Sequence, residues 1–205
     1  MSSPLCEVMS NNVYICASHK KNMQFTKNEI IDLIKAWVVI ALIFAIASRP
    51  ANDEFIRVLL SSAFAVGVGF LLHELAHKFV AQRYGLKAHF EAFEKTYFIS
   101  IVLALFQFIF IAPGAVMIKG ATDKIRLGRI AVAGPVTNIV IAILALIGNL
   151  FHPSTLLSFT AYINAFLAVF NMLPILVLDG KKVWNWNRNV FWSVMIVSII
   201  LVFIA

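Results

Sequence analysis

The sequence predicts an all-α polytopic membrane protein with about five transmembrane helices, or six. Hydrophobic residues make up 61% of the 205 positions and charged residues 13%, which is about half the charged share of a soluble domain. Several apolar runs also approach the length of about 20 residues that a helix needs to cross a bilayer. These runs are residues 30–48, 55–81, 98–118, 130–151, 155–178 and 190–205.

Residues 1–22 differ from the rest of the chain, because they are polar and show no apolar periodicity. We expect them to form a disordered extension, followed by a membrane-embedded domain at 23–205. The first helix should begin shortly after Met23, where Thr26 or Asn28 can accept hydrogen bonds from the free N–H groups of its first turn.

The basic residues indicate how often the chain crosses the membrane, because cytoplasmic loops carry an excess of Lys and Arg. If all six runs cross from a cytoplasmic N-terminus, the 17 basic residues divide into 8 inside and 9 outside. If 98–118 instead enters and leaves on one side, only Arg49 and Arg57 lie outside, and 15 lie inside. We therefore expect five crossings and a cytoplasmic N-terminus, with a kinked sixth helix at 98–118 as the alternative.

The residues around 98–118 favour the same interpretation. Pro113 and Gly114 interrupt the run, and 98–110 is rich in β-branched and aromatic residues, which suit strands as well as helices. Non-helical backbone is tolerated at membrane depth where protein or a water-filled cavity covers it. We therefore expect a β-strand or re-entrant segment near 85–118.

A metal-binding pattern, His73-Glu74-Leu75-Ala76-His77, lies inside the second apolar run. Residues four apart share one face of a helix, so His73 and His77 can hold one metal ion, with Glu74 beside it to act on a water molecule. Ionisable groups in a membrane span are costly unless they are paired, metal-bound or facing a polar cavity. The pattern therefore predicts a buried metal site, and the alternative is two helix histidines with Glu74 in an ion pair.

The third metal ligand can be sought by elimination, because a catalytic zinc usually takes three protein ligands and one water. No histidine follows at the longer HExxHxxGxxH spacing, and no glutamate follows Glu94. Asp179 lies at the depth of the histidines if the chain crosses five times, and Gly180 lets the backbone turn there. A turn aspartate is the alternative role. The full set of candidates is His89, Glu91, Glu94, Asp123, His152 and Asp179.

Three motifs in this order make the chain resemble the site-2 proteases, a family of intramembrane zinc metalloproteases. HELAH at 73–77 is similar to the family's zinc-binding helix, and AGPVTN at 133–138 is similar to its GPxxN segment. NMLPILVLDG at 171–180 is similar to NxxP followed by LDG. The matched region is about 55–182, and the resemblance implies that it forms the catalytic core from the runs 55–81, 130–151 and 155–178.

The resemblance also implies roles for single residues. One zinc ion per chain would be held by His73, His77 and Asp179, and Glu74 would be the general base. Such proteins carry β-strands between the first two core helices, and an edge strand there could pair with an unwound substrate segment. The motifs contribute further candidates: Asn138 and Asn171 for the oxyanion, with a structural role equally open for Asn138, and Gly134, Pro135, Pro174 and Gly180 as structural residues near the metal.

The function predicted from these features is hydrolysis of a peptide bond in a transmembrane segment of a membrane protein, near its cytoplasmic end. A non-catalytic metal carrier or sensor is the alternative, although such a protein has no use for a base like Glu74. Metalloproteases that process prenylated proteins need a downstream glutamate ligand, which this chain does not offer. The net charge of +7 does not indicate nucleic-acid binding, because the basic residues flank apolar runs. The expected partners are the bilayer and a transmembrane substrate, and the oligomeric state is not indicated.

Overall fold

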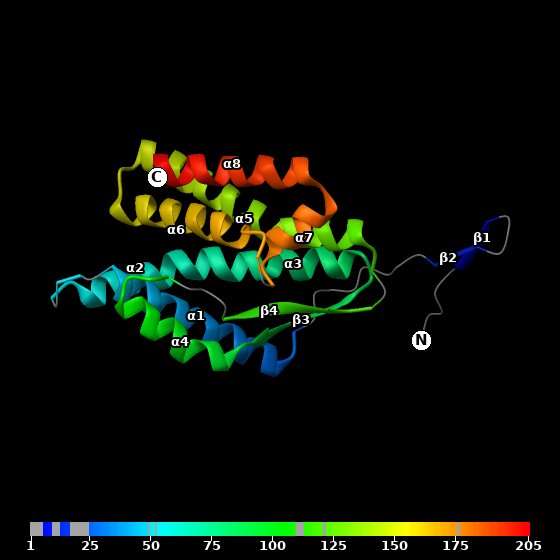
Figure 1. The fold of residues 1–205 in the computed structure, drawn as a ribbon, viewed down its shortest axis with the longest axis horizontal. Coiled ribbons are helices and arrows are strands. Elements are labelled where there is room, and N and C mark those ends of the chain that lie inside the picture. Colours follow the sequence, from blue (N-terminus) through cyan, green and yellow to red (C-terminus); the bar gives the residue numbers. More distant parts are fainter. Residues whose placement is uncertain are drawn as a thin grey trace.

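The computed structural model describes residues 6–9, 13–16, 25–48, 50–51, 53–109, 113–120, 122–175 and 177–205, with side chains from residue 25 onward. Helices make up most of this part of the chain (Figure 1). They are α1 (Lys27–Ala47), α2 (Phe55–Val66), the π-helix η1 (Gly67–Leu71), α3 (Leu72–Arg83), α4 (Glu94–Leu105), α5 (Lys124–Phe151), α6 (Thr155–Asn171), α7 (Asp179–Trp186) and α8 (Arg188–Ile204). The strands are β1 (Cys6–Met9), β2 (Val13–Cys16), β3 (Lys87–Ala92) and β4 (Gly114–Lys119).

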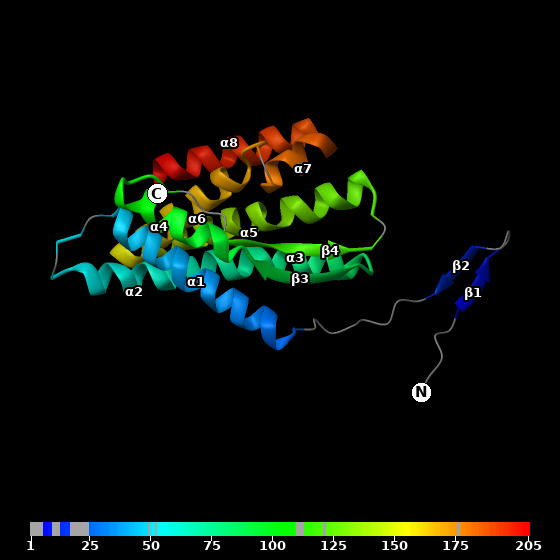
Figure 2. The same cartoon turned by 60° about the horizontal axis from the view of Figure 1, so that its bottom comes forward.

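The N-terminal part of the chain contains a short antiparallel hairpin of β1 and β2, which both views draw apart from the helices (Figures 1 and 2). The expectation that 1–22 forms a disordered extension is not tested by these two strands and stays a prediction. The predicted start of the first helix is confirmed at Thr26. Its hydroxyl accepts from the Glu29 N–H at 3.2 Å, and the Glu29 carboxylate accepts from the Thr26 N–H, which forms a capping box.

The centre of the molecule is formed by α3, α5 and α6. α5 packs along both α3 and α6, and α7 and α8 cover its other side. The hairpin of β3 and β4 lies beside α3, with α1 and α4 beyond it (Figure 1). This arrangement brings the segments carrying the three sequence motifs together around α5.

Three helices are long and apolar enough to cross a bilayer: Lys27–Ala47, the continuous helix Phe55–Arg83, and Lys124–Phe151. α6 and α8 are apolar but have 17 residues each, about 26 Å at the usual rise per residue, which is a few ångströms short of a hydrocarbon core. A membrane protein is thus confirmed, whereas the expectation of five crossings stays a prediction for α6 and α8. Large apolar side chains remain exposed on the helices, among them Val140, Leu144, Leu150, Trp192 and Phe203.

The segment predicted to be re-entrant contains both helix and strand. α4 has 12 residues, which corresponds to about 18 Å and falls well short of the bilayer core. β4 then pairs with β3 in antiparallel register, from Lys87 opposite Lys119 to Ala92 opposite Gly114. The Phe93 N–H donates to the Pro113 carbonyl at 2.8 Å, so the chain leaves and rejoins the hairpin at one place. The β-strand expected near 85–118 is therefore confirmed.

The outer edge of β3 is covered by acidic side chains of α1. Glu29 accepts from the Phe90 N–H at 3.0 Å, and Asp32 accepts from the Ala92 N–H at 3.3 Å. Glu29 also forms a buried ion pair with Lys78 of α3, at 2.6 and 2.7 Å. The N-terminal turns of α1 thus fix both the sheet and the helix that carries the HELAH pattern.

Candidate metal centre

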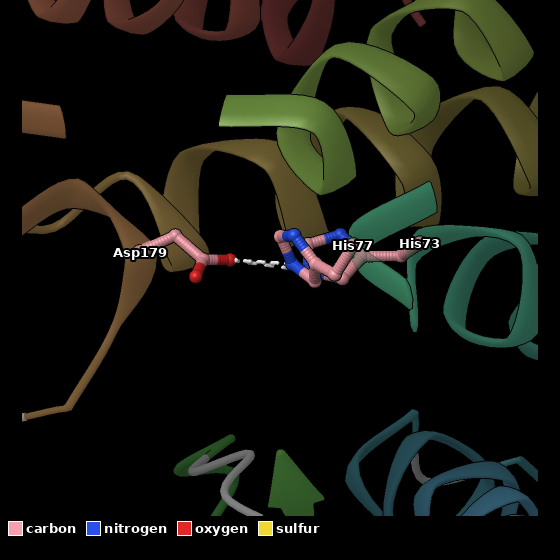
Figure 3. A group of neighbouring side chains, drawn as sticks. All are labelled: His73, His77 and Asp179. Carbon is pink, nitrogen blue, oxygen red and sulfur yellow. Dashed lines mark hydrogen bonds and ion pairs between the residues drawn. The ribbon is translucent and has the colours of Figure 1, made fainter. Parts of the chain in front are cut away.

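The structure brings His73, His77 and Asp179 together into one buried group (Figure 3). The Nε2 atoms of the two histidines lie 3.0 Å apart. Oδ2 of Asp179 lies 2.9 Å from Nε2 of His77 and 3.3 Å from Nε2 of His73. The i, i+4 spacing on α3 sets the histidine pair, and Asp179 reaches it as the first residue of α7.

The other ring nitrogen of each histidine has its own partner. Nδ1 of His77 lies 2.7 Å from the Ile130 carbonyl, and Nδ1 of His73 lies 2.5 Å from Oδ1 of Asn138. A carbonyl oxygen can only accept, so Nδ1 of His77 carries the proton and its Nε2 presents a lone pair. Such support is the usual way in which a metal-binding histidine is oriented.

A metal ion fits this donor set. Two Nε2 lone pairs and a carboxylate that converge on one point repel one another unless a cation lies between them. Ligand atoms about 2.1 Å from a tetrahedral zinc lie about 3.4 Å from each other, and the three separations here are 3.0, 2.9 and 3.3 Å. Two imidazoles and one carboxylate also leave the fourth position of a zinc site open for water or substrate.

Asp179 is held in its ionised form by its neighbours. Burial acts to raise the pKa of its carboxyl group, but the positive charge of a protonated His77, hydrogen bonds from His73 and His77, and Lys182 outweigh burial and hold that pKa well below its ordinary range. A metal ion bound at the two Nε2 lone pairs would favour the ionised carboxylate in the same way. Nζ of Lys182 lies 3.4 Å from Oδ1 of Asp179, the oxygen turned away from the histidines. Gly180 is required next to Asp179, because a Cβ there would overlap the Met172 carbonyl group.

Glu74 lies beside this group with a free oxygen. Its side chain is buried, and Oε2 has no hydrogen-bond partner among the residues that the structure describes. The backbone N–H of Val116 in β4 faces the same carboxylate. A cavity lined by Glu74, both histidines, Asn171 and Asp179 joins the carboxylate to the metal ligands. A buried carboxylate without a partner is costly, which is the arrangement expected of a group reserved for chemistry.

Two residues of α5 adapt the helix to the histidines. A Cβ on Gly134 would overlap the Nε2 atoms of both His73 and His77, so only glycine lets α5 approach them this closely. Pro135 lies inside α5 and is buried. Because proline has no N–H, the carbonyl of Ala131 loses its helical donor, and Ala131 lines the cavity.

The two asparagines proposed for the oxyanion lie in different settings. Asn138 is fully buried, and its Nδ2 donates to the Gly69 carbonyl at 3.2 Å and to Oδ1 of Asn164 at 3.0 Å. Asn171 lines the cavity, and its Nδ2 donates to the Leu167 carbonyl at 3.0 Å. Pro174 is exposed in the connection between α6 and α7.

The remaining acids and histidines considered as ligands lie elsewhere. His89 and Glu91 are on β3, 4.0 Å apart, and Glu94 pairs with Lys35 of α1. Asp123 caps the N-terminus of α5, and His152 ends that helix.

Sequence reasoning missed three groups at this centre: the Ile130 carbonyl, Asn164 and Lys182. Lys182 could have been found, since it stands three residues after Asp179 and the two share a face if a helix begins there. Asn164 offered a weaker signal as a polar residue in an apolar run. A backbone carbonyl that binds a distant side chain leaves no pattern in the sequence.

Comparison with known proteins identifies the family. A family model for peptidase family M50 matches residues 151–192, which contain α6 and Asp179. A protein of Methanocaldococcus jannaschii named "Putative zinc metalloprotease" is 42% identical over 179 residues, covering 84% of this chain and 91% of the relative. The chain belongs to peptidase family M50.

The other comparisons agree with this assignment. A second M. jannaschii protein, named as a zinc metalloprotease, is 28% identical over 158 residues, covering 75% of this chain and 41% of the relative. No solved structure gives a significant match. The M50 assignment confirms the resemblance to the site-2 proteases, the metalloprotease activity and zinc as the cofactor, which the donor set of His73, His77 and Asp179 fits.

Proposed function

We propose that the chain is an intramembrane protease, which hydrolyses a peptide bond in a transmembrane segment of a membrane-protein substrate. The observation that carries this proposal is the buried, unpartnered Oε2 of Glu74 beside three converging metal ligands. Both features lie on or against two helices of membrane-spanning length, Phe55–Arg83 and Lys124–Phe151. A substrate segment inside the bilayer can reach a site between such helices, whereas a soluble protein would first have to enter the membrane.

The chemistry follows from the positions of the side chains. Zinc, when bound by His73, His77 and Asp179, supplies the Lewis acidity that polarises a scissile carbonyl and acidifies water. Glu74 takes a proton from the attacking water on its free Oε2 and then passes it to the leaving amine. Lys182 pairs with Asp179 at 3.4 Å and favours its ionised form.

The developing oxyanion needs hydrogen-bond donors besides the metal. We assign this role to Asn171, because it lines the cavity with Glu74 and one N–H of an amide remains after the bond to Leu167. Asn138 is less suited, since its Nδ2 group already donates to Gly69 and Asn164. Asn138 is better explained as the support of His73.

The free edge of β4 is the proposed place for the substrate backbone. In an antiparallel pair, successive residues direct their N–H and C=O groups to opposite edges. Phe90 turns its N–H away from β4 to Glu29, so its partner Val116 turns away from β3 as well. Val116, Gly114 and Ile118 line the cavity that contains Glu74. An extended substrate segment that pairs with this edge would run past the catalytic carboxylate.

We further propose that the N-terminus and the metal centre lie toward the cytoplasm. The hydrogen bond between Phe93 and Pro113 returns the chain to its starting point without a net crossing. With α1, α2–α3, α5, α6 and α8 as crossings, 15 of the 17 basic residues then lie on one side, as the positive-inside rule requires. Asp179 and the histidines are on that side.

The decisive test compares the purified protein in detergent with its Glu74→Gln variant, on a peptide containing one transmembrane segment. We expect both to bind about one zinc per chain, and the variant to cut about 10²–10⁴-fold more slowly, the usual contribution of a general base. Zinc bound by both proteins without cleavage of any membrane substrate would favour a metal carrier or sensor. Absence of zinc from both would refute the assignment of the ligands.

A further inference from the structure

We propose that Asn164 of α6 is a positioning residue that acts through Asn138 to fix the tautomer of His73, and thereby strengthens metal binding. Asn164 touches none of the three ligands, and no motif contains it. The inference rests on the proposed role of His73 as a ligand, but not on the peptidase activity.

The two asparagines form an unbroken series of hydrogen bonds in the centre of the protein, which runs from the Thr160 carbonyl to His73. Both side chains are fully buried. Nδ2 of Asn164 donates to the Thr160 carbonyl at 2.9 Å, and Oδ1 of Asn164 accepts from Nδ2 of Asn138 at 3.0 Å. Oδ1 of Asn138 then faces Nδ1 of His73 at 2.5 Å. The series thus links α6 to α5 and α5 to α3.

The direction of each bond follows from the backbone at its end. The Thr160 carbonyl can only accept, so the amide nitrogen of Asn164 must face it and its oxygen must face Asn138. The amide nitrogen of Asn138 therefore points to Asn164, and to the Gly69 carbonyl at 3.2 Å as well. Its oxygen is left for His73, which must carry a proton on Nδ1. In the neutral ring Nε2 is then unprotonated and available to a metal without a change of tautomer.

The backbone is shaped to admit this series of bonds. Gly69 lies in the π-helix η1, directly before the helix that carries the two histidines. A Cβ at Gly69 would lie 2.6 Å from Oδ1 of Asn164, so a larger residue would displace the asparagine. π-Helical turns are uncommon and often mark functional positions, and here the turn lies where the Asn164 side chain comes close to Gly69.

His77 provides an internal control, because its Nδ1 is held by the Ile130 backbone carbonyl and not by Asn164. A change at Asn164 should therefore alter the tautomer of His73 and leave that of His77 unchanged. A general loosening of the helices would change both rings together. This difference separates positioning of one ligand from a merely structural role.

The test uses the full chain without metal, with ¹⁵N-labelled histidine and at a pH high enough that both rings are neutral, and reads the two tautomers by NMR. In Asn164→Leu, Asn138 loses its acceptor on α6 and keeps only the longer bond, 3.2 Å, to the Gly69 carbonyl, so that its amide can rotate more easily. We expect the Nε2–H tautomer of His73 to become populated, while His77 stays as it was. Zinc titration of the same variant should give a Kd up to about 10-fold higher, the lower end of the roughly 10–100-fold loss that follows removal of a metal-binding histidine's own partner, because Asn138 itself remains.

Two further variants complete the experiment. Asn164→Asp keeps an oxygen acceptor for Asn138 and, as the neutral acid that burial favours, an O–H donor for the Thr160 carbonyl. We expect the His73 tautomer of the parent and a Kd within about threefold of the parent value, well below the roughly 10–100-fold loss that follows removal of a histidine's partner. Asn149→Leu makes the same chemical change at an asparagine bonded to Ser158 and Ser154, away from the metal centre, and should leave both readouts unchanged.

The inference is overturned if folded Asn164→Leu keeps the parent tautomer and Kd, if both histidines change together, or if Asn164→Asp loses as much affinity as the leucine variant. Should Asn164→Leu fail to fold, Asn164→Asp alone decides, because loss of the His73 tautomer there contradicts the proposal. A chain that binds zinc in this way but cuts no substrate would refute the proposed function and leave this inference standing.

Discussion

The two sides of α3 carry buried charged groups that differ in one respect. Toward α1, Lys78 is balanced by both oxygens of Glu29 and by the ring of Phe25, 3.9 Å from its Nζ. Toward α5, His73, His77 and Asp179 face one another, and Glu74 beside them has a free oxygen. The first cluster is complete within the chain, whereas the second is complete only when a cation and a reacting group are present.

This difference separates a structural cluster from a functional one. Buried charges with full sets of partners hold elements in place, and here they fix α1 and β3 to α3. Buried charges without partners persist only where binding or catalysis requires them. Variants on the α1 side should therefore change the free energy of unfolding, and variants on the α5 side should change zinc binding.

The largest expected effect is on the α1 side. Replacing Glu29 with alanine leaves the buried Lys78 unpaired, which should lower the free energy of unfolding by about 3–5 kcal/mol. Replacing both residues by apolar ones of similar volume, Glu29→Leu with Lys78→Met, should recover much of that loss. Denaturant unfolding of the parent, the single variants and the double variant checks this. If the single and double variants lose the same free energy of unfolding, the cost does not come from leaving Lys78 unpaired.

The next effect is on the α5 side, at Gly134. In Gly134→Ala the new Cβ overlaps the Nε2 atoms of His73 and His77, so we expect zinc affinity to fall by at least about 10–100-fold, the scale of disturbing a ligand's surroundings. Gly148→Ala is a matched control in the same helix, because its Cβ would meet Leu157 only at ordinary contact distances of 3.5 and 4.0 Å.

The control should bind zinc like the parent and gain up to about 1 kcal/mol in stability, since alanine is the better helix former. Zinc titration and thermal unfolding of both variants give the two readouts. If Gly134→Ala keeps its affinity for zinc, α5 is not held against the histidines as closely as we infer.

The three residues predicted as ligands come together in the structure, and this proximity could be predicted because its signals are local or topological. HELAH places two histidines on one face of a helix, and the charge balance of the loops places Asp179 at the same depth. Both arguments depend on the free-energy cost of placing a charged side chain in the hydrocarbon core of the membrane. A β-strand or re-entrant segment near 85–118 could also be predicted, from Pro113 and Gly114 and from the excess of basic residues on one side, although its antiparallel pairing could not.

Other features could not be predicted, because they depend on how helices meet. The stretch from Phe98 to Leu105 is helical, although its β-branched and aromatic residues suit both structures, and no local rule decides between them. The role of Asn138 was open for a similar reason. Its amide could face the metal or a neighbouring helix, and only the packing of α5 against α3 and α6 places it beside His73.

The smallest expected effect concerns the edges of the hairpin. Asp32 accepts from the Ala92 N–H, and Asp32→Ala would expose that edge of β3 at a cost of about 0.5–1.5 kcal/mol, the net value of one hydrogen bond. Asp32→Asn keeps an oxygen acceptor and should cost less. If covering β3 directs the substrate to β4, Asp32→Ala should also permit some pairing at the wrong edge. Cross-linking of a substrate cysteine to position 92 as well as to 116 would reveal it, whereas an unchanged preference for 116 would show that the cavity alone selects the edge.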